Sequence, residues 1–525
     1  MSWSPAFKAL LNQPSRGWRV RVRSLTWYDS FQVGFRTLAW EYTNYRLGAG
    51  DEGYLIDLGT INGATIAPPD FRTSWGTFSF TVAQPLRTGS VISRGQLCVV
   101  EAGGVDWSPQ DFEPVAIGQV WSIRGDAHSI TVECRDVLAS LTTRITQSNV
   151  DARLFSELGT TTLSSGYSPG DATMSLTSVT GFEFETGGTG LVQVEDNQGE
   201  LSFVSFTGIS GNDLTGLTHS LLDTTSANAG SGNTVRCVAY IPDHPIDVAL
   251  KLLLSTGAGT NGPLDTLPDS WGYALPEAMV DTLVSQKHKF HSQPLTGSTS
   301  WEAYSLEPQE DGIAWIRDGL QLGGWVMVVR QGRIAIRAIP DHTGGPVGSP
   351  LGYQSTIELD NSDLLEGVLP EVEWYDQGYD REWRQVRLAT VSTTGTRSEK
   401  LQTMPAGALV EIDISAYLHA NEAAWITSLG RRLAPWYLRV PERITLEVTC
   451  GQAAQVAAGD TVRITTDRYA GRMWPLERHL ALVLSSSFDL LRGTGTLVLS
   501  ILPSDLDVNA APLEEAPVAD EDDIG

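Results

Sequence analysis

Short runs in which apolar and polar residues alternate recur along this chain, separated by Gly and Pro. In GWRVRVRSLTW the apolar positions from Trp18 to Val22 alternate with the arginines from Arg19 to Arg23. Alternation with a period of two places one set of side chains on each face of a strand. We therefore expect a half-buried strand with a solvated cationic face, and the alternative is a docking edge for an acidic neighbour.

Further strand-like runs lie at residues 76–82, 96–102 and 129–141, each bounded by turn-forming residues. Short strands at such spacing are typical of a barrel or sandwich. Residues 1–150 are therefore predicted to form an N-terminal β-barrel domain.

The composition changes between residues 151 and 240, where Ser, Thr and Gly dominate and Lys and Arg are almost absent. SGND at Ser210–Asp213 suits a tight hairpin, because Gly and Asn tolerate positive φ. These features predict a small, independent, all-β module in this segment.

Helical periodicity appears in IPDHPIDVALKLLLSTG. Pro245 suits a first helical position, with His244 or Asp243 as the cap, and the apolar stripe predicts an amphipathic helix docked on a core. A second helix is expected in DGIAWIRDGLQLGG. Residues 241–365 are therefore predicted to form a helix and hairpin region.

The hairpin is predicted in WVMVVRQGRIAIRAI, where Gln331 and Gly332 join two alternating runs. A third helix is expected at residues 420–436, ending before Pro435, because proline disfavours a helical residue before it. Four or five strand-like runs follow this helix. They predict a second β-barrel-like domain over residues 366–502.

The chain of 525 residues is long enough for several domains, so the predicted fold class is mainly β with some α (α+β), multi-domain. Its formal net charge of −26 opposes non-specific binding to nucleic acid. Residues 503–525 hold eight acidic residues and no basic one, which predicts an acidic flexible tail. No apolar run suits a signal peptide or a membrane-spanning segment, so we expect synthesis in a cytosol.

GAGTNG at Gly257–Gly262 matches a glycine pattern that binds dinucleotide phosphates in some enzymes. That function requires the glycines to follow a strand and to open a helix. Here they follow the predicted helix at Pro245. We interpret the stretch as a helix terminator and a turn, with Gly257 in a left-handed conformation.

Acidic and aromatic residues crowd together in EVEWYDQGYDREW. The carboxylates of this acidic cluster are Glu371, Glu373, Asp376, Asp380 and Glu382. With 16 tryptophans in the chain, a glycoside hydrolase is an alternative, because such enzymes use two carboxylates about 5–10 Å apart. A solvated turn with aromatic anchors is the favoured interpretation.

His288 and His291 are three residues apart, but a third metal ligand is not evident, so a loop or strand with ordinary histidines is favoured. The cysteines are widely separated, at Cys98, Cys134, Cys237 and Cys450. Buried free thiols are favoured over disulfides or zinc ligation. The sequence therefore predicts no catalytic, cofactor-binding or metal-binding residue, and no enzyme.

The order of elements between residues 151 and 240 resembles a small β-module found in many bacteriophage virion proteins. The resemblance rests on Gly181 and Phe182, a Val-rich strand, a strand ending in FTG, then GNDLTGLT and a final Val strand. The module usually continues with Arg-Gly after the threonine. In this chain His219 and Ser220 stand at those two positions.

The stretches after residue 240 resemble, in their order, the baseplate hub or tail-tip hub proteins of long-tailed bacteriophages. They are HPIDVALKLLLSTGAGTNGPLDTLP, GGWVMVVRQGRIAIRAI, RRLAPWYLRVPERITLEVTC and AAGDTVRIT. The resemblance implies a homotrimer whose subunits each carry two β-barrel domains, so that the trimer matches a hexameric ring. It also implies contacts with a distal tail protein or tail tube ring, a central fibre or spike, and the tape measure protein.

In such a role the protein is located in the virion, at the phage tail tip, and closes the tail until DNA ejection. DNA passes it without sequence-specific binding, and the net negative charge suits such passage. The alternative is a tail adhesin that degrades or binds polysaccharide, which the tryptophans and the Ser/Thr-rich module motivate.

Overall fold

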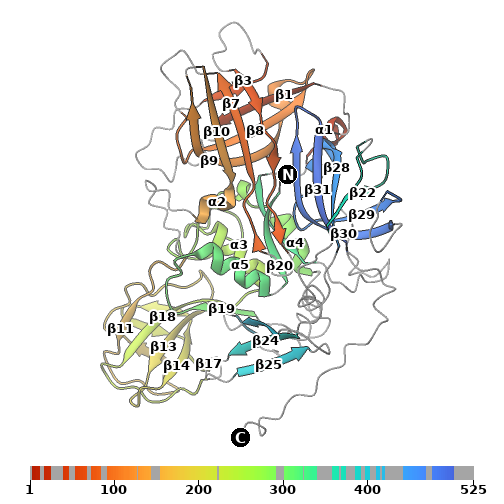
Figure 1. The fold of residues 1–525 in the computed structure, drawn as a ribbon. Helices are drawn as coiled ribbons and strands as arrows, with labels where there is room; N and C mark the ends of the chain where they lie inside the picture. Colours follow the sequence, from red (N-terminus) through yellow and green to blue (C-terminus); the bar gives the residue numbers. More distant parts are fainter. Residues whose placement is uncertain are drawn as a thin grey trace.

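The structure is a computed structural model. It describes residues 3–11, 17–24, 40–45, 54–67, 72–83, 92–126, 128–142, 154–221, 224–290, 301–322, 324–330, 332–339, 357–365, 368–373, 385–391, 397–402, 409–413, 417–419, 442–468 and 476–501. Strands far outnumber helices in these ranges, so the fold is mainly β and is built from several sheets (Figure 1).

One large sheet includes fourteen of the described strands, in the order β2-β1-β8-β9-β10-β7-β4-β30-β31-β28-β23 along its main path. Off this path, β3 pairs with β7, β29 with β30 and β22 with β29. The N-terminal strands are β1 (Trp18–Ser24), β2 (Glu41–Thr43), β3 (Leu55–Leu58), β4 (Ile61–Asn62), β7 (Thr77–Ala83), β8 (Leu97–Gly104), β9 (Glu113–Gly125) and β10 (Ser129–Asp136). The others are β22 (Ile357–Leu359), β23 (Glu371–Glu373), β28 (Arg443–Thr449), β29 (Thr461–Thr466), β30 (Leu476–Asp489) and β31 (Thr494–Ile501).

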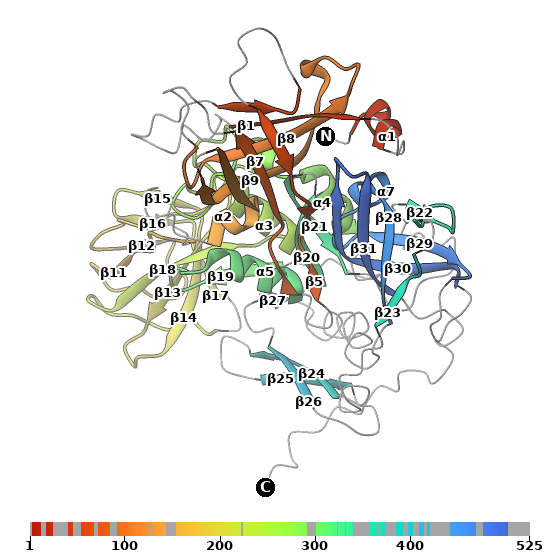
Figure 2. The same cartoon turned by 45° about the horizontal axis from the view of Figure 1, so that its top comes forward.

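The N-terminal and C-terminal strands meet within this sheet, where β4 pairs with β30. Figure 2 shows the two groups of strands, with β7 to β9 in one and β28 to β31 in the other, next to each other. Asn62 lies opposite Ser487 and Ile61 opposite Phe488. One buried apolar cluster includes side chains from both the N-terminal and the C-terminal strands. Strands that are more than 400 residues apart in sequence therefore share a sheet and a core.

The described strands do not close into a barrel. At the open end of the N-terminal strands, Thr43 and Tyr54 share a single isolated parallel bridge. The predicted alternation of β1 is confirmed, since Val20 and Val22 are fully buried.

The segment that resembles the phage β-module has its own buried core, in which Leu176, Val204 and Phe206 lie. Its strands are β11 (Thr160–Thr162), β12 (Thr173–Ser175), β13 (Gly190–Glu195), β14 (Leu201–Phe206), β15 (Gly208–Ser210), β16 (Asp213–Thr215), β17 (Thr218–Leu221) and β18 (Thr234–Ile241). The predicted hairpin at Ser210–Asp213 is confirmed, with Gly211 at φ 62°.

The module is less independent than predicted, because its main sheet continues beyond residue 240. That sheet has the order β17-β14-β13-β18-β19-β27, where β19 (Trp301–Ser305) and β27 (Tyr417–His419) come from later in the chain. Two further small sheets are formed by β24 (Gln385–Val391), β25 (Arg397–Gln402) and β26 (Leu409–Asp413), and by β5 (Ile66–Ala67) with β6 (Arg72–Thr73).

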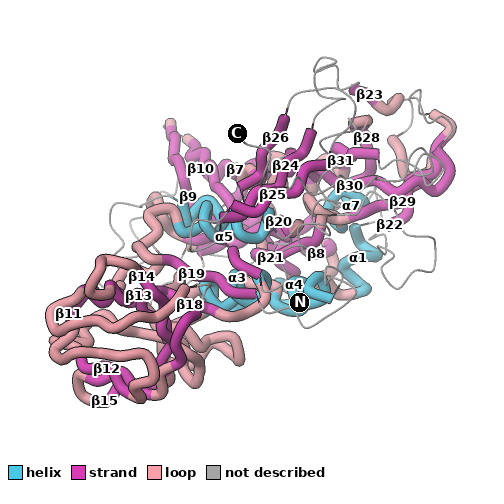
Figure 3. The backbone as a smooth tube through the Cα atoms, turned by 90° about the horizontal axis from the view of Figure 1, so that it is seen from below, coloured by secondary structure: helices cyan, strands magenta, loops and turns pink. Residues whose placement is uncertain are grey.

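Helices α3, α4 and α5 lie between the module and the large sheet (Figures 1 and 3). The described α-helices are α1 (Pro5–Leu11), α2 (Val137–Thr142), α3 (Pro245–Leu254), α4 (Thr282–Phe290), α5 (Gly312–Leu322) and α7 (Cys450–Gln455). The predicted hairpin is confirmed as β20 (Trp325–Arg330) and β21 (Arg333–Ala338), packed on α5 and α4.

Helix α3 begins at Pro245 with His244 as its cap, as predicted. The amphipathic interpretation is wrong, because every residue of α3 is buried, Asp247 and Lys251 included. Both charged side chains have partners that make burial tolerable: Lys251 forms ion pairs, and Asp247 accepts a hydrogen bond from Gln286 Nε2 at 2.6 Å.

Two further predictions need correction. The run predicted as a strand at residues 129–141 is a strand only to Asp136, and helix α2 follows because Asp136 accepts a hydrogen bond from the Ala139 amide at 3.1 Å. Helix α7 after β28 was not predicted. The third predicted helix, residues 420–436, lies outside the described residues.

Candidate functional site

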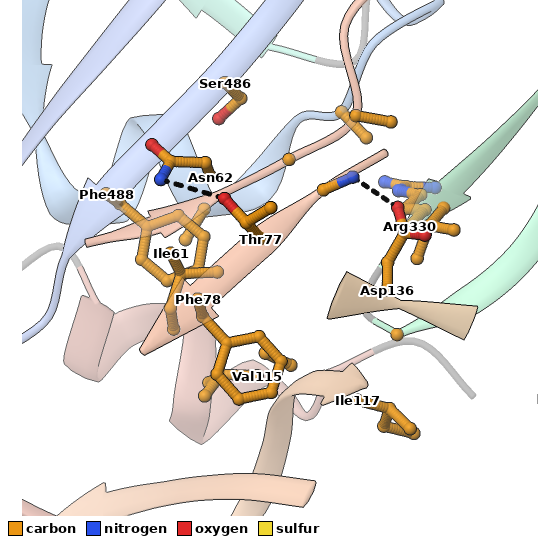
Figure 4. A pocket seen from close by; sticks show the side chains of 18 of the residues that line it. Ile61, Asn62, Thr77, Phe78, Val115, Ile117, Asp136, Arg330, Ser486 and Phe488 are labelled. Carbon is orange, nitrogen blue, oxygen red and sulfur yellow. Dashed lines mark hydrogen bonds between the residues drawn. The ribbon is translucent and has the colours of Figure 1, made fainter. Parts of the chain in front are cut away.

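A cavity of about 70 Å³ lies where the N-terminal strands, the C-terminal strands and hairpin β20–β21 meet (Figure 4). Apolar side chains supply most of its wall: Trp3, Ile61, Phe78, Val115, Ile117 and Phe488. Asp136 and Arg330 also line it. A cavity of this size has space for a few water-sized groups.

Asp136 is the acidic residue of this cavity. It is 5 % exposed at the end of β10 and accepts hydrogen bonds from the amides of Gly76 at 2.5 Å and Ala139 at 3.1 Å. Burial raises the pKa of its carboxyl to about 6. None of the described residues lining the cavity supplies a second carboxylate, so the cavity lacks the acid pair that glycoside hydrolysis requires. An Asp directly before an apolar run is a cap signal, and it would have located α2 in the sequence.

A buried ion pair fixes hairpin β20–β21 to the C-terminal strands beside the cavity. Arg337 Nη2 lies 2.8 Å from Asp460 Oδ1, and Arg330 Nε lies 3.8 Å from Asp460 Oδ2. Asp460 is fully buried and also accepts the Ala457 amide at 2.9 Å. Burial lowers the pKa of Arg337, while the carboxylate opposes that shift. No sequence pattern predicts this contact, because residue 460 is far from the hairpin in sequence.

The arginines of β1 are not solvated as expected. Arg21 Nε donates to Glu101 Oε2 at 2.7 Å, and Arg23 Nη2 donates to Glu101 Oε1 at 2.7 Å. Arg21 lies directly opposite Glu101 on the paired strand β8. The acidic neighbour is therefore part of the same chain.

The GAGTNG loop binds a carboxylate from its own chain. Thr256 N and Asn261 N donate to Asp265 at 2.6 and 2.9 Å, and Thr256 Oγ1 donates at 2.5 Å. Burial opposes ionisation of Asp265, but these hydrogen bonds lower its pKa overall. Gly257 has φ 73°, as predicted for a residue just after a helix. The backbone amides that could bind a phosphate here already donate to the Asp265 carboxylate, which agrees with the helix-terminator interpretation.

The other predicted residues do not form a site in the described part of the chain. His288 lies in helix α4, so the loop or strand interpretation is wrong for it, and His291 lies outside the described residues. Glu371 and Glu373 lie in strand β23 rather than in a turn. Asp376, Asp380 and Glu382 lie outside the described residues.

The four cysteines are free and buried, as predicted. Cys98 Sγ and Cys134 Sγ are in contact at 3.4 Å inside the N-terminal strands. Burial raises the pKa of the Cys237 and Cys450 thiols to about 12, which keeps them protonated and unreactive. Within the described residues, His, Cys, Asp and Glu form no group suited to holding a metal ion.

His219 of β17 contacts the loop between β11 and β12, at the position where the resembled module usually has Arg. Its Nδ1 lies 2.5 Å from Tyr167 Oη, and its Nε2 accepts the Gly170 amide at 3.3 Å. The adjoining Ser220 has φ 59°. That left-handed conformation suits the glycine that the module usually has there.

No family model matches the sequence, and no curated protein matches it by sequence. Among solved structures, the chain is similar to a 43 kDa tail protein of prophage MuSo2 from Shewanella oneidensis, with 10% identity, 92% of this chain and 98% of that chain covered, and a TM-score of 0.35. It is also similar to a chain in the virion of a native gene transfer agent particle, with 16% identity, coverage of 45% and 83%, and a TM-score of 0.19.

A third similarity is to a chain in a topological model of the p2 virion baseplate in its activated conformation, with 8% identity, coverage of 66% and 89%, and a TM-score of 0.16. None of the described helices is long and apolar enough to cross a membrane.

Proposed function

We propose that this chain is a structural hub of a bacteriophage tail tip or baseplate. In this proposal it forms a homotrimeric ring that joins the hexameric tail tube or distal tail ring to a central fibre or spike. The ring closes the tail until the tape measure protein and DNA leave. The ordered stretches after residue 240 support the proposal, since they resemble hub proteins as a set.

The observation that carries the proposal is the pairing of β4 with β30, which holds two strand-rich regions of one subunit side by side. A trimer of such subunits offers six β-structured positions to a hexameric neighbour. Each region is proposed to be a barrel-like hub domain, and the bridge between Thr43 and Tyr54 favours this description for the first. The proposed domains are residues 1–150, 151–240, 241–365, 366–502 and 503–525.

Native mass spectrometry of the full chain tests the proposed trimer. We expect a species with three times the mass of the 56.9 kDa chain, alone or with purified distal tail protein. A chain that stays monomeric in both conditions contradicts the proposal.

The proposed role is structural rather than enzymatic. Incubation with capsular or wall polysaccharide of the host is expected to release no new reducing ends. Reducing ends that appear with the protein, and are absent from a control sample without it, would instead support the polysaccharide-degrading alternative.

A further inference from the structure

The chain enters the module through a segment that is anchored in the core of the helical region. Leu154 and Gln309 exchange two backbone hydrogen bonds, at 3.0 and 2.9 Å. Phe155 is 1 % exposed and forms edge-on contacts with Trp271 and Trp315, with centroids 5.7 and 5.3 Å away. Its φ of 57° is uncommon for a bulky residue, so the surrounding contacts must hold it in place.

The chain leaves the module along a strand that belongs to both parts. Strand β18 pairs with β13 inside the module and, further along, with β19 outside it. Tyr240 lies opposite Tyr304, and Ile241 opposite Ala303. Because the same strand carries both ladders, a hinge at this point would have to break backbone hydrogen bonds.

A buried ion pair connects the module to helix α3 between these two crossings. Lys251 Nζ on α3 donates to Glu185 Oε1 of the module and, at 2.7 Å, to Asp243 Oδ2. Thr266 Oγ1 donates to the same Glu185 oxygen at 2.6 Å. The side chains of Lys251 and Glu185 are only 10 % and 12 % exposed, so removing Lys251 would leave the Glu185 carboxylate buried without its cationic partner.

The loop after GAGTNG supplies further contacts with the module. The Thr186 amide donates to the Thr266 carbonyl at 2.9 Å, and the Ser156 amide donates to the Ser270 carbonyl at 2.9 Å. Ser270 Oγ also donates to Glu183 Oε2. The loop that resembles a phosphate-binding motif therefore continues into a docking surface for the module.

We infer that the module is a rigid arm, held in one orientation relative to α3 and α5 by the Phe155 anchor, the shared strand β18 and the Lys251–Glu185 ion pair. A flexibly attached module would instead be joined by exposed linkers with few contacts across them. A partner that binds the outer loops of the module would therefore push or pull on the helical region directly. This inference concerns the chain itself and does not depend on the proposed hub function.

Double electron–electron resonance on the full chain tests the inference. It measures the distance between spin labels attached at Gln198→Cys in the module and at Arg124→Cys in β9. Both native positions are exposed, whereas the native cysteines are buried. We expect a single narrow distance distribution. A broad or multi-peaked distribution in this otherwise unaltered protein overturns the inference.

Variants of the joint then test which contacts hold the arm. Lys251→Met and Phe155→Ala are each expected to broaden the distribution at least twofold and to speed amide exchange at Leu154 and Gln309. Lys251→Arg keeps the charge and is expected to retain the narrow distribution. Arg492→Met, which removes the exposed arginine of an ion pair with the mostly buried Asp489, is the matched control and should change nothing. An unchanged distribution in both Lys251→Met and Phe155→Ala removes these residues from the inferred joint.

Discussion

At the scale of single residues, Ser220 is held in a conformation that suits glycine. Its φ is 59°, and its hydroxyl accepts the Ser226 amide at 3.2 Å. Ser220→Ala and Ser220→Gly both lose that hydrogen bond, but only glycine relieves the strain. We expect the glycine variant to be more stable than the alanine variant by about 1 kcal/mol, measured by urea unfolding. Equal stability, or greater stability of the alanine variant, would contradict the strain at this position.

Asp136 makes stability depend on pH. Burial raises the pKa of its carboxyl from 3.8 to about 6, so the folded state holds this proton more tightly than the unfolded chain does. The stabilisation from binding this proton is fully present below pH 3.8, the pKa of the carboxyl in the unfolded chain, and is lost as the pH rises through the folded pKa of about 6. Relative to Asp136→Asn, the unfolding free energy of the unaltered protein should therefore fall as pH rises, by on the order of 3 kcal/mol in total.

Urea unfolding of both proteins from pH 5 to pH 8 measures the part of this fall that lies above pH 5, on the order of 1 kcal/mol. Asp126→Asn serves as the control, because hydrogen bonds from His128 and Ser129 lower the pKa of the exposed Asp126 carboxyl, which places its titration below this range. A difference between the unaltered protein and Asp136→Asn that does not vary with pH would show that Asp136 is not titrating there.

At the scale of elements, hairpin β20–β21 lies between the N-terminal and C-terminal strands and contacts both. At its tip, Gly332 has φ 75°, and a Cβ there would lie 2.5 Å from Ile117 Cγ1. Arg337 and Arg330 of the same hairpin reach Asp460. The hairpin therefore fixes the distance between the two regions.

Gly332→Ala is expected to destabilise the protein through both strain and overpacking, by about 2–4 kcal/mol. Gly211→Ala is the matched control, because Gly211 also has positive φ, 62°, but no atom lies within 4 Å of the added Cβ. The control should lose only about 1 kcal/mol. Thermal unfolding of the two variants measures the contrast, and equal losses would mean that the contact with Ile117 does not matter.

At the scale of the whole molecule, the pairing of β4 with β30 joins regions that are far apart in sequence. The Gly63 amide donates to the Ser486 carbonyl at 2.8 Å, which makes Asn62 and Ser487 a non-hydrogen-bonded pair. The Cα atoms of such pairs are about 4.5 Å apart, a distance that a disulfide can span.

The double variant Asn62→Cys with Ser487→Cys is therefore expected to form a disulfide on mild oxidation, seen as a shift of the non-reduced chain on gel electrophoresis. The oxidised form should unfold at a higher temperature than the reduced form, because the link closes a long loop of the unfolded chain. Asn62→Cys alone is the control and should show neither effect. Failure of the pair to oxidise in the folded protein would contradict the β4–β30 register.

Local sequence patterns correctly predicted those helices, strands and turns that are determined by residues close together in the sequence. Examples are the alternation of Trp18 to Val22, the proline start of α3 and the pairing of β20 with β21 as a hairpin. The patterns gave wrong predictions of solvent exposure where a side chain has a partner on a neighbouring strand. The arginines of β1 were expected to be solvated because no residue near them in the sequence indicates that Glu101 lies opposite them in the folded chain.

The sequence by itself determined that the chain is mainly β, where a few of its helices begin, and that its thiols are buried. Period-two alternation, capping residues and turn residues determine structure over a few neighbouring positions. Only the tertiary structure decided that β4 meets β30, that Asp460 receives two arginines, and that Lys251 ties α3 to the module. These contacts bring together residues from distant parts of the chain. Their energies depend on burial and charge pairing in the folded state, which no local pattern records.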